Sequence, residues 1–384
     1  MRIAYVCADP GIPVFGQKGG SIHVQEVIRA LRRQGATVEL FAVRFDGAPP
    51  ADLADLRCHA LPKLPKGDLA WREQAALANN STLLADLAAA GPFDAIYERY
   101  SLWSYSALEF AQTQGLPGLL EVNAPLIDEQ ARHRGLVHRD LAEQVARRAF
   151  GAASQLIAVS AEVKQYLADW VSAERVAVIP NGVNHHRFTA AALPPSPPDD
   201  FTVGFVGSLK PWHGLSVLVG AFDRLRQRVP QARLLIVGDG PERSALAAEL
   251  AQRQLQAVTQ LTGAVPPERI PQLLSQMTVA VAPYPATADF YFSPLKVVEY
   301  MAAGLPVVVS DLGQLRHLVS DNVTGLRRPP GDEQALATAL EQLWRRPDWR
   351  RSLGQAARQH ILTHHTWDAV AGRILALARP VSRL

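Results

Sequence analysis

Two series of short apolar runs, separated by segments of helical periodicity, constrain the fold of this chain more than any other feature. In the first half the runs lie at 2–8, 38–43, 94–97, 117–122 and 155–160. In the second half they are FTVGFVG, ARLLIVG, VTQLTG, TVAVAP and PVVVS. Apolar strands that alternate with helices are typical of a parallel sheet covered by helices. The sequence therefore predicts an α/β protein with two doubly wound parallel sheets.

A proline-rich segment, AALPPSPPDD at 191–200, separates the two series and is expected to be a linker. The chain of 384 residues is also longer than one hydrophobic core usually holds. We therefore expect one domain at 1–190 and a second at 201–365. Residues 366–384 carry apolar side chains at helical spacing and are expected to form a last amphipathic helix that needs a partner surface.

Composition and charge exclude several classes of protein. Hydrophobic residues make up 48% and charged residues 20%, which excludes a disordered or collagen-like chain. The net charge of +3 is too small to favour nucleic acid as a partner. The longest apolar stretch, 297–309, is interrupted by a glutamate, a glycine and a proline, so no membrane span is predicted. Only Cys7 and Cys58 are present, and the apolar start is too short for a signal peptide, so a cytoplasmic location is expected.

A glycine-rich loop follows the first apolar run. Gly19 and Gly20 precede Ser21, which we expect to cap the next helix. Such a loop lets an anion approach the free N–H groups of a first helical turn. The spacing matches neither dinucleotide nor P-loop fingerprints, which disfavours a hydride-transfer enzyme and a nucleoside triphosphatase. Contact with a phosphate or sugar and a plain strand-to-helix turn remain alternatives here.

A similar loop opens the second half, at 207–214. Lys210 and His213 lie where a strand ends and a helix begins, and they would help to neutralise a diphosphate. A solvated lysine and an incidental loop histidine are the alternative interpretation.

A short helix is predicted near the end of the second series. Ser293 is expected at its N-cap, Pro294 at the first helical position and Gly304 just beyond its end. Lys296 and Glu299, three residues apart, share one face near the positive end of this helix. The lysine would suit phosphate oxygens, and the carboxylate would accept hydrogen bonds from both hydroxyls of a ribose. The alternative is a surface ion pair worth about 0.2–0.5 kcal/mol.

Several segments together resemble the retaining glycosyltransferases of family four, also called glycosyl transferases group 1. They are the loop Gly16–Ser21, LIAVSAEV at 156–163, IPNGVNHHRF at 179–188, VGSLKPWHG at 206–214, LLIVGDGPER at 234–243 and SPLKVVEYMAAGLPVVVSD at 293–311. The resemblance implies the GT-B fold, in which two Rossmann-like domains face each other across a cleft. It also implies that the last segment of the chain crosses back to the first domain.

The resemblance further implies roles for residues around the predicted short helix. Glu299 resembles the second glutamate of the paired-glutamate motif of the family, the one that binds the nucleotide ribose. Tyr291 stands where the first glutamate is usual. Contacts to the donor sugar are therefore expected from Asp289, Tyr291 or the backbone around Phe292 and Ser293.

In the loop at 207–214, Ser208 and His213 occupy positions where the family usually has an arginine and a lysine. We expect Lys210, together with Lys296 and the helix start at Pro294 and Leu295, to take over neutralisation of the phosphates. His213 would then be auxiliary.

In the first domain, Asn123 stands where family members often place a histidine near the donor sugar. Glu121 and Glu129 are candidates on the acceptor side. A capping asparagine and solvated glutamates are the alternative interpretation. Tyr97 and Trp103 would line the acceptor cleft with aromatic faces or simply pack in the core.

By this resemblance the protein is a retaining glycosyltransferase that moves a hexose-type sugar from a nucleotide-diphosphate donor to a hydroxyl acceptor. No resident metal or cofactor is expected. A nucleotide-sugar epimerase of similar build and a non-catalytic nucleotide-sugar binder are the alternatives. The basic residues between 132 and 148 would suit anionic lipid at the inner membrane face, or form a solvated helix face. The nucleotide base, the sugar, the acceptor and the oligomeric state stay open.

Overall fold

The computed structural model describes residues 1–188, 201–286 and 293–379. The expected linker at 191–200 and the candidates Asp289, Tyr291 and Phe292 lie outside these residues. The chain divides into two compact units. The first comprises Met1–Asn181 and the segment from Trp367 onward, and the second runs from Gly182 to Thr366 except for 291–293.

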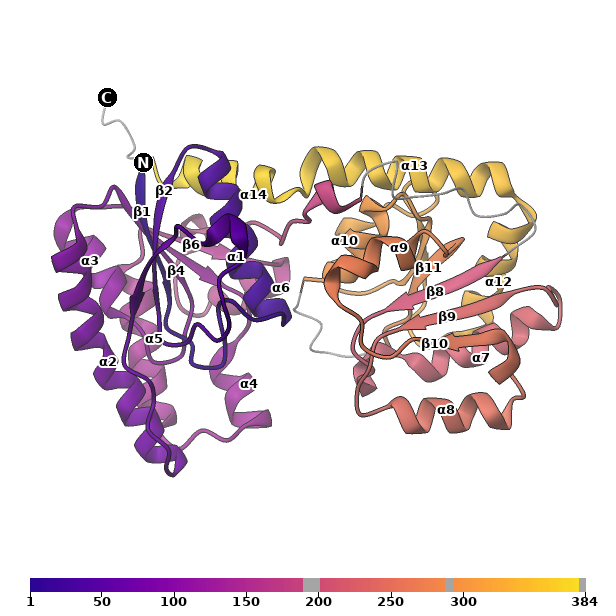
Figure 1. Ribbon diagram of the computed structural model, residues 1–384, viewed down its shortest axis with the longest axis horizontal. Helices are drawn as coiled ribbons and strands as arrows, with labels where there is room; N and C mark the ends of the chain where they lie inside the picture. Colours follow the sequence, from indigo (N-terminus) through magenta and orange to yellow (C-terminus); the bar gives the residue numbers. More distant parts are fainter. Residues whose placement is uncertain (189–200, 287–292, 380–384) are drawn as a thin grey trace. The chain divides into compact units, whose positions relative to one another are not determined.

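The first unit contains a parallel sheet whose described strands follow the order β3-β2-β1-β4-β5-β6-β7. The strands are β1 (Arg2–Cys7), β2 (Thr37–Ala42), β3 (Arg57–Ala60), β4 (Ala95–Arg99), β5 (Gly118–Val122), β6 (Gln155–Ala158) and β7 (Val176–Val178). The helices are α1 (Gly19–Arg33), α2 (Leu69–Ala90), α3 (Ser106–Gln114), α4 (Leu126–His133), α5 (Arg139–Ala152), α6 (Ala161–Leu167) and α14 (Trp367–Leu377) (Figure 1).

Helices cover both faces of this sheet because alternate strand residues point to opposite sides. Ile3 and Tyr5 of β1 belong to a core cluster that also includes α1 and α14. Ala4 and Val6 belong to the cluster that includes α2 and α3 on the other face. Strands buried on both faces read as continuous apolar runs, which is why the sequence pattern located them.

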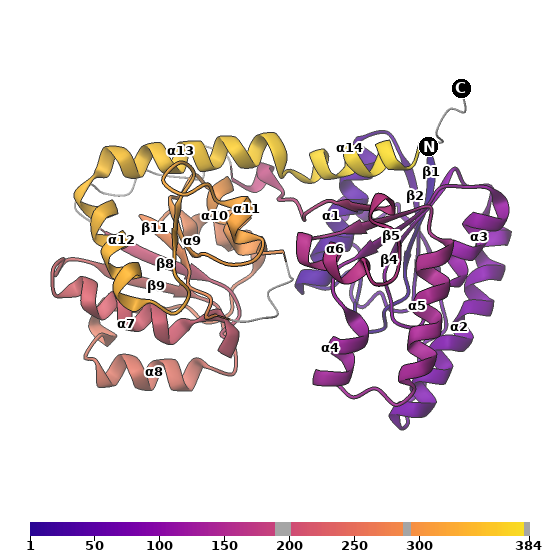
Figure 2. The same ribbon diagram turned by 180° about the vertical axis from the view of Figure 1, so that it is seen from behind.

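The second unit contains a parallel sheet in the order β10-β9-β8-β11-β12-β13. Its strands are β8 (Thr202–Val206), β9 (Arg233–Val237), β10 (Thr259–Leu261), β11 (Val279–Ala282), β12 (Val307–Ser310) and β13 (Leu326–Arg328). Its helices are α7 (Leu215–Arg226), α8 (Arg243–Gln252), α9 (Ile270–Leu274), α10 (Leu295–Ala302), α11 (Leu315–Leu318), α12 (Glu333–Arg345) and α13 (Pro347–His364) (Figure 2). The predicted pair of parallel α/β sheets is thus confirmed.

The C-terminal helix α14 packs on α1 of the first unit. Its apolar residues Trp367, Val370 and Ile374 are buried in the same core cluster as Val24 and Leu31 of α1. Arg33 adds an ion pair to Asp368, with 2.8 Å between the guanidinium and the carboxylate. No helix among residues 1–188, 201–286 and 293–379 is both long enough and apolar enough to cross a membrane.

Candidate functional site

The candidate site in the second unit lies at the carboxyl ends of its strands, where open α/β sheets bind their ligands. The loop after β8 begins at Gly207, and the loop after β11 leads through 283–286 toward α10. Tyr300 of α10 joins these parts, because its hydroxyl accepts from Val206 N at 2.6 Å and lies 3.1 Å from Val206 O. This buried contact ties α10 to the end of β8.

Helix α10 starts one residue later than predicted. Pro294 has φ −81° and ψ 70°, which is not helical, so it is the N-cap residue and the helix begins at Leu295. The prediction that Ser293 caps the helix is wrong, because this serine lies one position too early. No side chain caps the first turn of α10. The prediction for the other end is confirmed, since Gly304 follows the helix with φ +76°.

Lys296 is the most unusual side chain of this site. Its Nζ is buried and has no hydrogen-bond partner among the described residues. The ammonium lies 4.3 Å from the centroid of Phe205 and 5.3 Å from that of Tyr284, so aromatic faces are its nearest counterpart. Burial lowers the pKa of Lys296 from its ordinary value of 10.5 to about 7. A buried cation without a partner on the first turn of a helix is suited to bind an anion.

Gly207 provides the space that this lysine occupies. Its φ of +152° disfavours other residues, and a Cβ built on it would lie 2.8 Å from Lys296 Nζ. A side chain at this position would therefore push the ammonium out of its place.

Glu299 forms an ion pair with Arg187, a residue for which the sequence predicted no role. Arg187 Nη1 lies 3.2 Å from Glu299 Oε1, and a second nitrogen of the guanidinium donates to Pro267 O. Burial raises the pKa of Glu299, and the charge of Arg187 opposes this rise. The alternative of a Lys296–Glu299 ion pair is not found, since the ammonium of Lys296 lies against rings instead. No local pattern could have found Arg187, which lies 112 residues before Glu299.

The loop after β8 brings Lys210 and His213 to the same site. Lys210 precedes a single turn, Pro211–His213, and its Nζ lies 5.7 Å from the Trp212 ring centroid. His213 is buried, and its Nδ1 lies 2.5 Å from Ser208 O. Burial lowers the pKa of His213 to about 4, and the charges of Lys296 and Lys210 act in the same direction. The histidine is therefore uncharged near neutral pH, and Lys210 supplies the positive charge of this loop.

The first unit holds a separate buried polar network around Glu121 of β5. His23 Nε2 lies 2.7 Å from the carboxylate and Arg99 Nη1 lies 3.1 Å from it. The Tyr97 hydroxyl and the Asn123 amide also donate to it. Although burial alone would raise the pKa of Glu121, His23 and Arg99 lower it to about 2. Glu121 is thus an ionised core residue, and its interpretation as a solvated glutamate is wrong.

The network determines the surroundings of Asn123 and Tyr97. The Asn123 side-chain nitrogen donates one hydrogen bond to Glu121, which leaves the amide oxygen and the second N–H of the amide for contact with a ligand. Tyr97 is 1% exposed and therefore a core residue. The interpretation of Tyr97 as part of an aromatic acceptor surface is wrong.

The glycine-rich loop of the first unit also differs in detail from expectation. Helix α1 begins at Gly19, with Lys18 as N-cap and no side-chain cap. Ser21 therefore lies inside the first turn with Gly20, and the prediction that Ser21 caps the helix is wrong. Gln25 holds the loop by donating to Val14 O at 2.7 Å.

Comparisons with known proteins relate both units to one group. Residues 18–187 match the model of Glycosyltransferase Family 4, and residues 200–346 match that of Glycosyl transferases group 1. The α-maltose-1-phosphate synthase of Mycolicibacterium smegmatis is 28% identical over 100% of both chains. The D-inositol 3-phosphate glycosyltransferase of Stackebrandtia nassauensis is 29% identical over 94% of this chain and 87% of its own. The crystal structure of Anabaena Alr3699/HepE in complex with UDP superimposes with a TM-score of 0.71, at 21% identity over 98% of this chain and 99% of its own.

Proposed function

Because this chain belongs to glycosyltransferase family 4 of the glycosyl transferases group 1, with the GT-B fold, and transfers a sugar from a nucleotide-sugar donor, we propose that the donor binds at α10. The diphosphate lies against Lys296 and the first turn of the helix, and Lys210 approaches it from the loop after β8. Glu299 accepts hydrogen bonds from the ribose hydroxyls. The observation that carries this proposal is the buried Lys296 ammonium without a partner, beside an uncapped helix start.

These residues act on the leaving group. Transfer of the sugar leaves negative charge on the departing diphosphate, and preorganised cations and amides lower the energy of the transition state in which that charge develops. In a retaining reaction on one face of the sugar, a donor phosphate oxygen accepts the proton of the acceptor hydroxyl. No carboxylate nucleophile is then required.

The donor in this proposal is a uridine diphosphate hexose, supported by the UDP complex of the Anabaena protein. A thermal-shift screen of UDP, GDP, ADP, CMP and dTDP sugars tests this choice. A ligand at a hundred times its Kd adds about 2.7 kcal/mol of stability. We expect UDP sugars to give the largest shift in the wild type and a smaller one in Glu299→Gln. Equal shifts for all nucleotides, or none, would contradict the proposal.

The acceptor is a hydroxyl compound, bound by the first unit. Contact with anionic lipid receives little support from the basic residues between 132 and 148. Arg139 and Arg148 of this segment approach Asp128 and Glu109 to 2.7 Å, and Arg134 approaches Glu129 to 3.7 Å. These pairs reduce the positive charge available to a lipid surface.

Lys210→Ala is expected to raise the donor KM or lower turnover at least about tenfold, which corresponds to about 1.4 kcal/mol. The reason is that Lys210 supplies the positive charge of the loop after β8. Steady-state rates with UDP-glucose at several donor concentrations measure the effect. Lys66→Ala, an exposed lysine of the first unit, is the matched control. Equal rates for the two variants would refute the role of Lys210.

UDP binding is expected to weaken as the pH rises above about 7. Lys296 loses its proton near this pH in the unliganded protein, so at higher pH an anion binds only if the lysine takes up a proton. The affinity should therefore fall by about tenfold per pH unit above the pKa of the free protein. Calorimetric titrations with UDP at several pH values measure this slope. Lys296→Arg, which stays charged, should make UDP affinity nearly independent of pH. If the UDP affinity of the wild type does not change with pH, Lys296 is not the group that binds the phosphate.

A further inference from the structure

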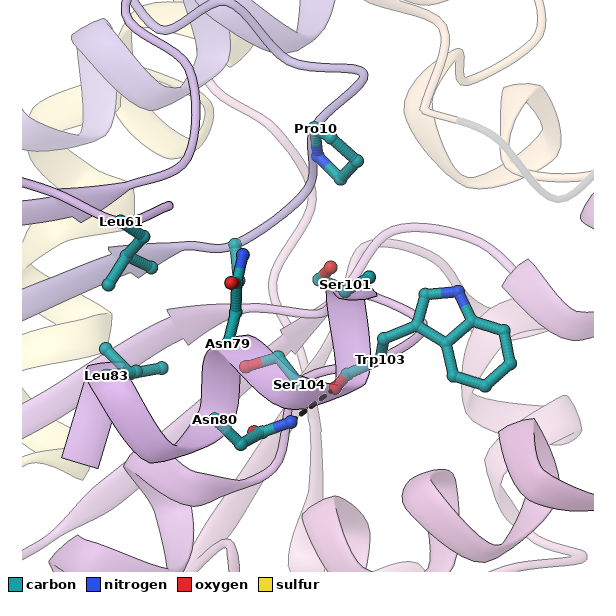
Figure 3. Close-up of a pocket in the computed structure, with 10 residues that line it drawn as sticks. Pro10, Leu61, Asn79, Asn80, Leu83, Ser101, Trp103 and Ser104 are labelled. Atoms are coloured by element: carbon teal, nitrogen blue, oxygen red, sulfur yellow. Dashed lines mark hydrogen bonds between the residues drawn. The ribbon is translucent and has the colours of Figure 1, made fainter. Parts of the chain in front are cut away.

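A small cavity lies at the carboxyl end of the first sheet (Figure 3). Pro10 and Leu61 follow β1 and β3, Ser101, Trp103 and Ser104 follow β4, and Asn79 comes from α2. The position is the ligand-binding edge of an open α/β sheet. The space inside is sufficient for little more than one water-sized group.

Ser104 is the polar side chain that this cavity leaves unsatisfied. It is 4% exposed, and its Oγ has no hydrogen-bond partner among the described residues. A buried hydroxyl without a partner is costly, so such a group usually has a missing ligand or water.

The neighbouring wall is rigid and already satisfied. The Asn80 amide donates to Trp103 O at 2.8 Å, and its oxygen accepts from the backbone N–H groups of Tyr105 and Ser106. The Asn79 amide donates to Pro62 O at 2.8 Å. These bonds hold the turn that carries Ser104 in one place, so its hydroxyl is preorganised for a ligand.

Glu98 lies behind Ser104. It is fully buried, and neither of its carboxyl oxygens has a hydrogen-bond partner within the described part of the chain. Burial raises the pKa of Glu98 to about 7. The Ser104 hydroxyl lies near enough to oppose this rise, although the two groups do not form a hydrogen bond of normal geometry. The carboxyl group and the hydroxyl together offer a hydrogen-bond donor and an acceptor.

The charge of the cavity selects among ligands. None of the side chains that line it is charged. A phosphate or carboxylate would lose its hydration there without gaining a cation from the lining side chains. An uncharged hydroxyl can instead both donate and accept there.

We infer that this cavity is an acceptor subsite that takes one uncharged hydroxyl group of a sugar or polyol, bound to Ser104 Oγ. This inference rests on the proposed function and deepens it, since it names a neutral polyhydroxy compound as the acceptor class. A phosphorylated group of an acceptor does not enter this cavity, because the lining side chains offer it no cation.

Saturation-transfer NMR with D-glucose, maltose and myo-inositol tests the subsite without any donor. We expect wild-type protein to bind at least one of these neutral probes, and Ser104→Ala to bind it about tenfold more weakly. Inorganic phosphate, which offers no uncharged alcohol group, should not displace the probe. Ser106→Ala is the matched control, because Ser106 is also buried with an unpartnered hydroxyl but does not line the cavity. A Glu98→Gln variant, which keeps the shape and removes the charge, should retain binding.

The outcomes separate the subsite from the proposed function. No binding of any neutral probe, equal affinity of Ser104→Ala and Ser106→Ala, or displacement by inorganic phosphate would overturn the subsite. The same samples are tested for stabilisation by nucleotide sugars. Stabilisation together with a failed probe test contradicts the subsite alone. If a neutral probe binds but no nucleotide sugar stabilises the protein, the donor proposal is wrong. The cavity then binds hydroxyl compounds without a role in sugar transfer.

Discussion

Lys296→Met lowers kcat/KM for the nucleotide sugar by about 10²- to 10³-fold in our account, the loss typical of removing one preorganised group that stabilises developing charge. Methionine keeps an unbranched apolar stem against Phe205 and Tyr284, so the variant removes charge and leaves the packing in place. Initial rates at varied donor concentration measure the effect.

Lys164→Met serves as the control for that experiment. Lys164 lies in the first unit, where its Nζ donates to Val176 O at 2.9 Å, so its loss should leave donor kinetics nearly unchanged. If Lys296→Met keeps wild-type kcat/KM, the diphosphate does not depend on this ammonium and the proposed donor site is wrong.

Glu121→Ala is expected to destabilise the first unit by about 3–5 kcal/mol, the usual cost of removing one partner of a buried ion pair. His23 and Arg99 would then lose the carboxylate that lies 2.7 Å and 3.1 Å from them. Urea denaturation followed by a probe in the first unit measures the free energy of unfolding. Glu143→Ala, which removes a more exposed pair with Arg139, should change it by about 0.5 kcal/mol or less.

The pH dependence of this stability supplies an independent check. The folded pKa of Glu121 is about 2, below its ordinary value of 4.5. Its contribution is therefore present above pH 4.5 and is lost as the pH falls toward about 2. The difference in stability between wild type and Glu121→Gln should narrow over that range. A difference that stays constant would show that the carboxylate is not ionised in the folded protein.

The strands buried on both faces could be predicted from the sequence because their apolar runs are continuous. The strands β3, β7 and β13 were missed. They lie at the edges of their sheets, and β3 (RCHA) and β13 (LRR) carry polar residues in short segments. An edge strand is covered on fewer sides, so its sequence does not need an apolar run.

The candidate site could be predicted only where its residues are close in sequence. Lys296 and Glu299 share one short helix, and their spacing identified them. Arg187 reaches Glu299 across 112 residues, and His23 reaches Glu121 across 98. These contacts depend on which strands and helices the fold brings together. They therefore leave no pattern among neighbouring residues of the sequence. The two predicted serine caps were wrong for a different reason, since the N-cap of α1 lies three residues before Ser21 and the N-cap of α10 lies one residue after Ser293.

A crystal structure of the full chain with bound UDP tests the central claim most directly. We expect the diphosphate within hydrogen-bond reach of Lys296 Nζ and the first amides of α10, with both ribose hydroxyls on the Glu299 carboxylate. A diphosphate bound away from Lys296, or a Glu299 carboxylate that does not contact the ribose, would contradict it.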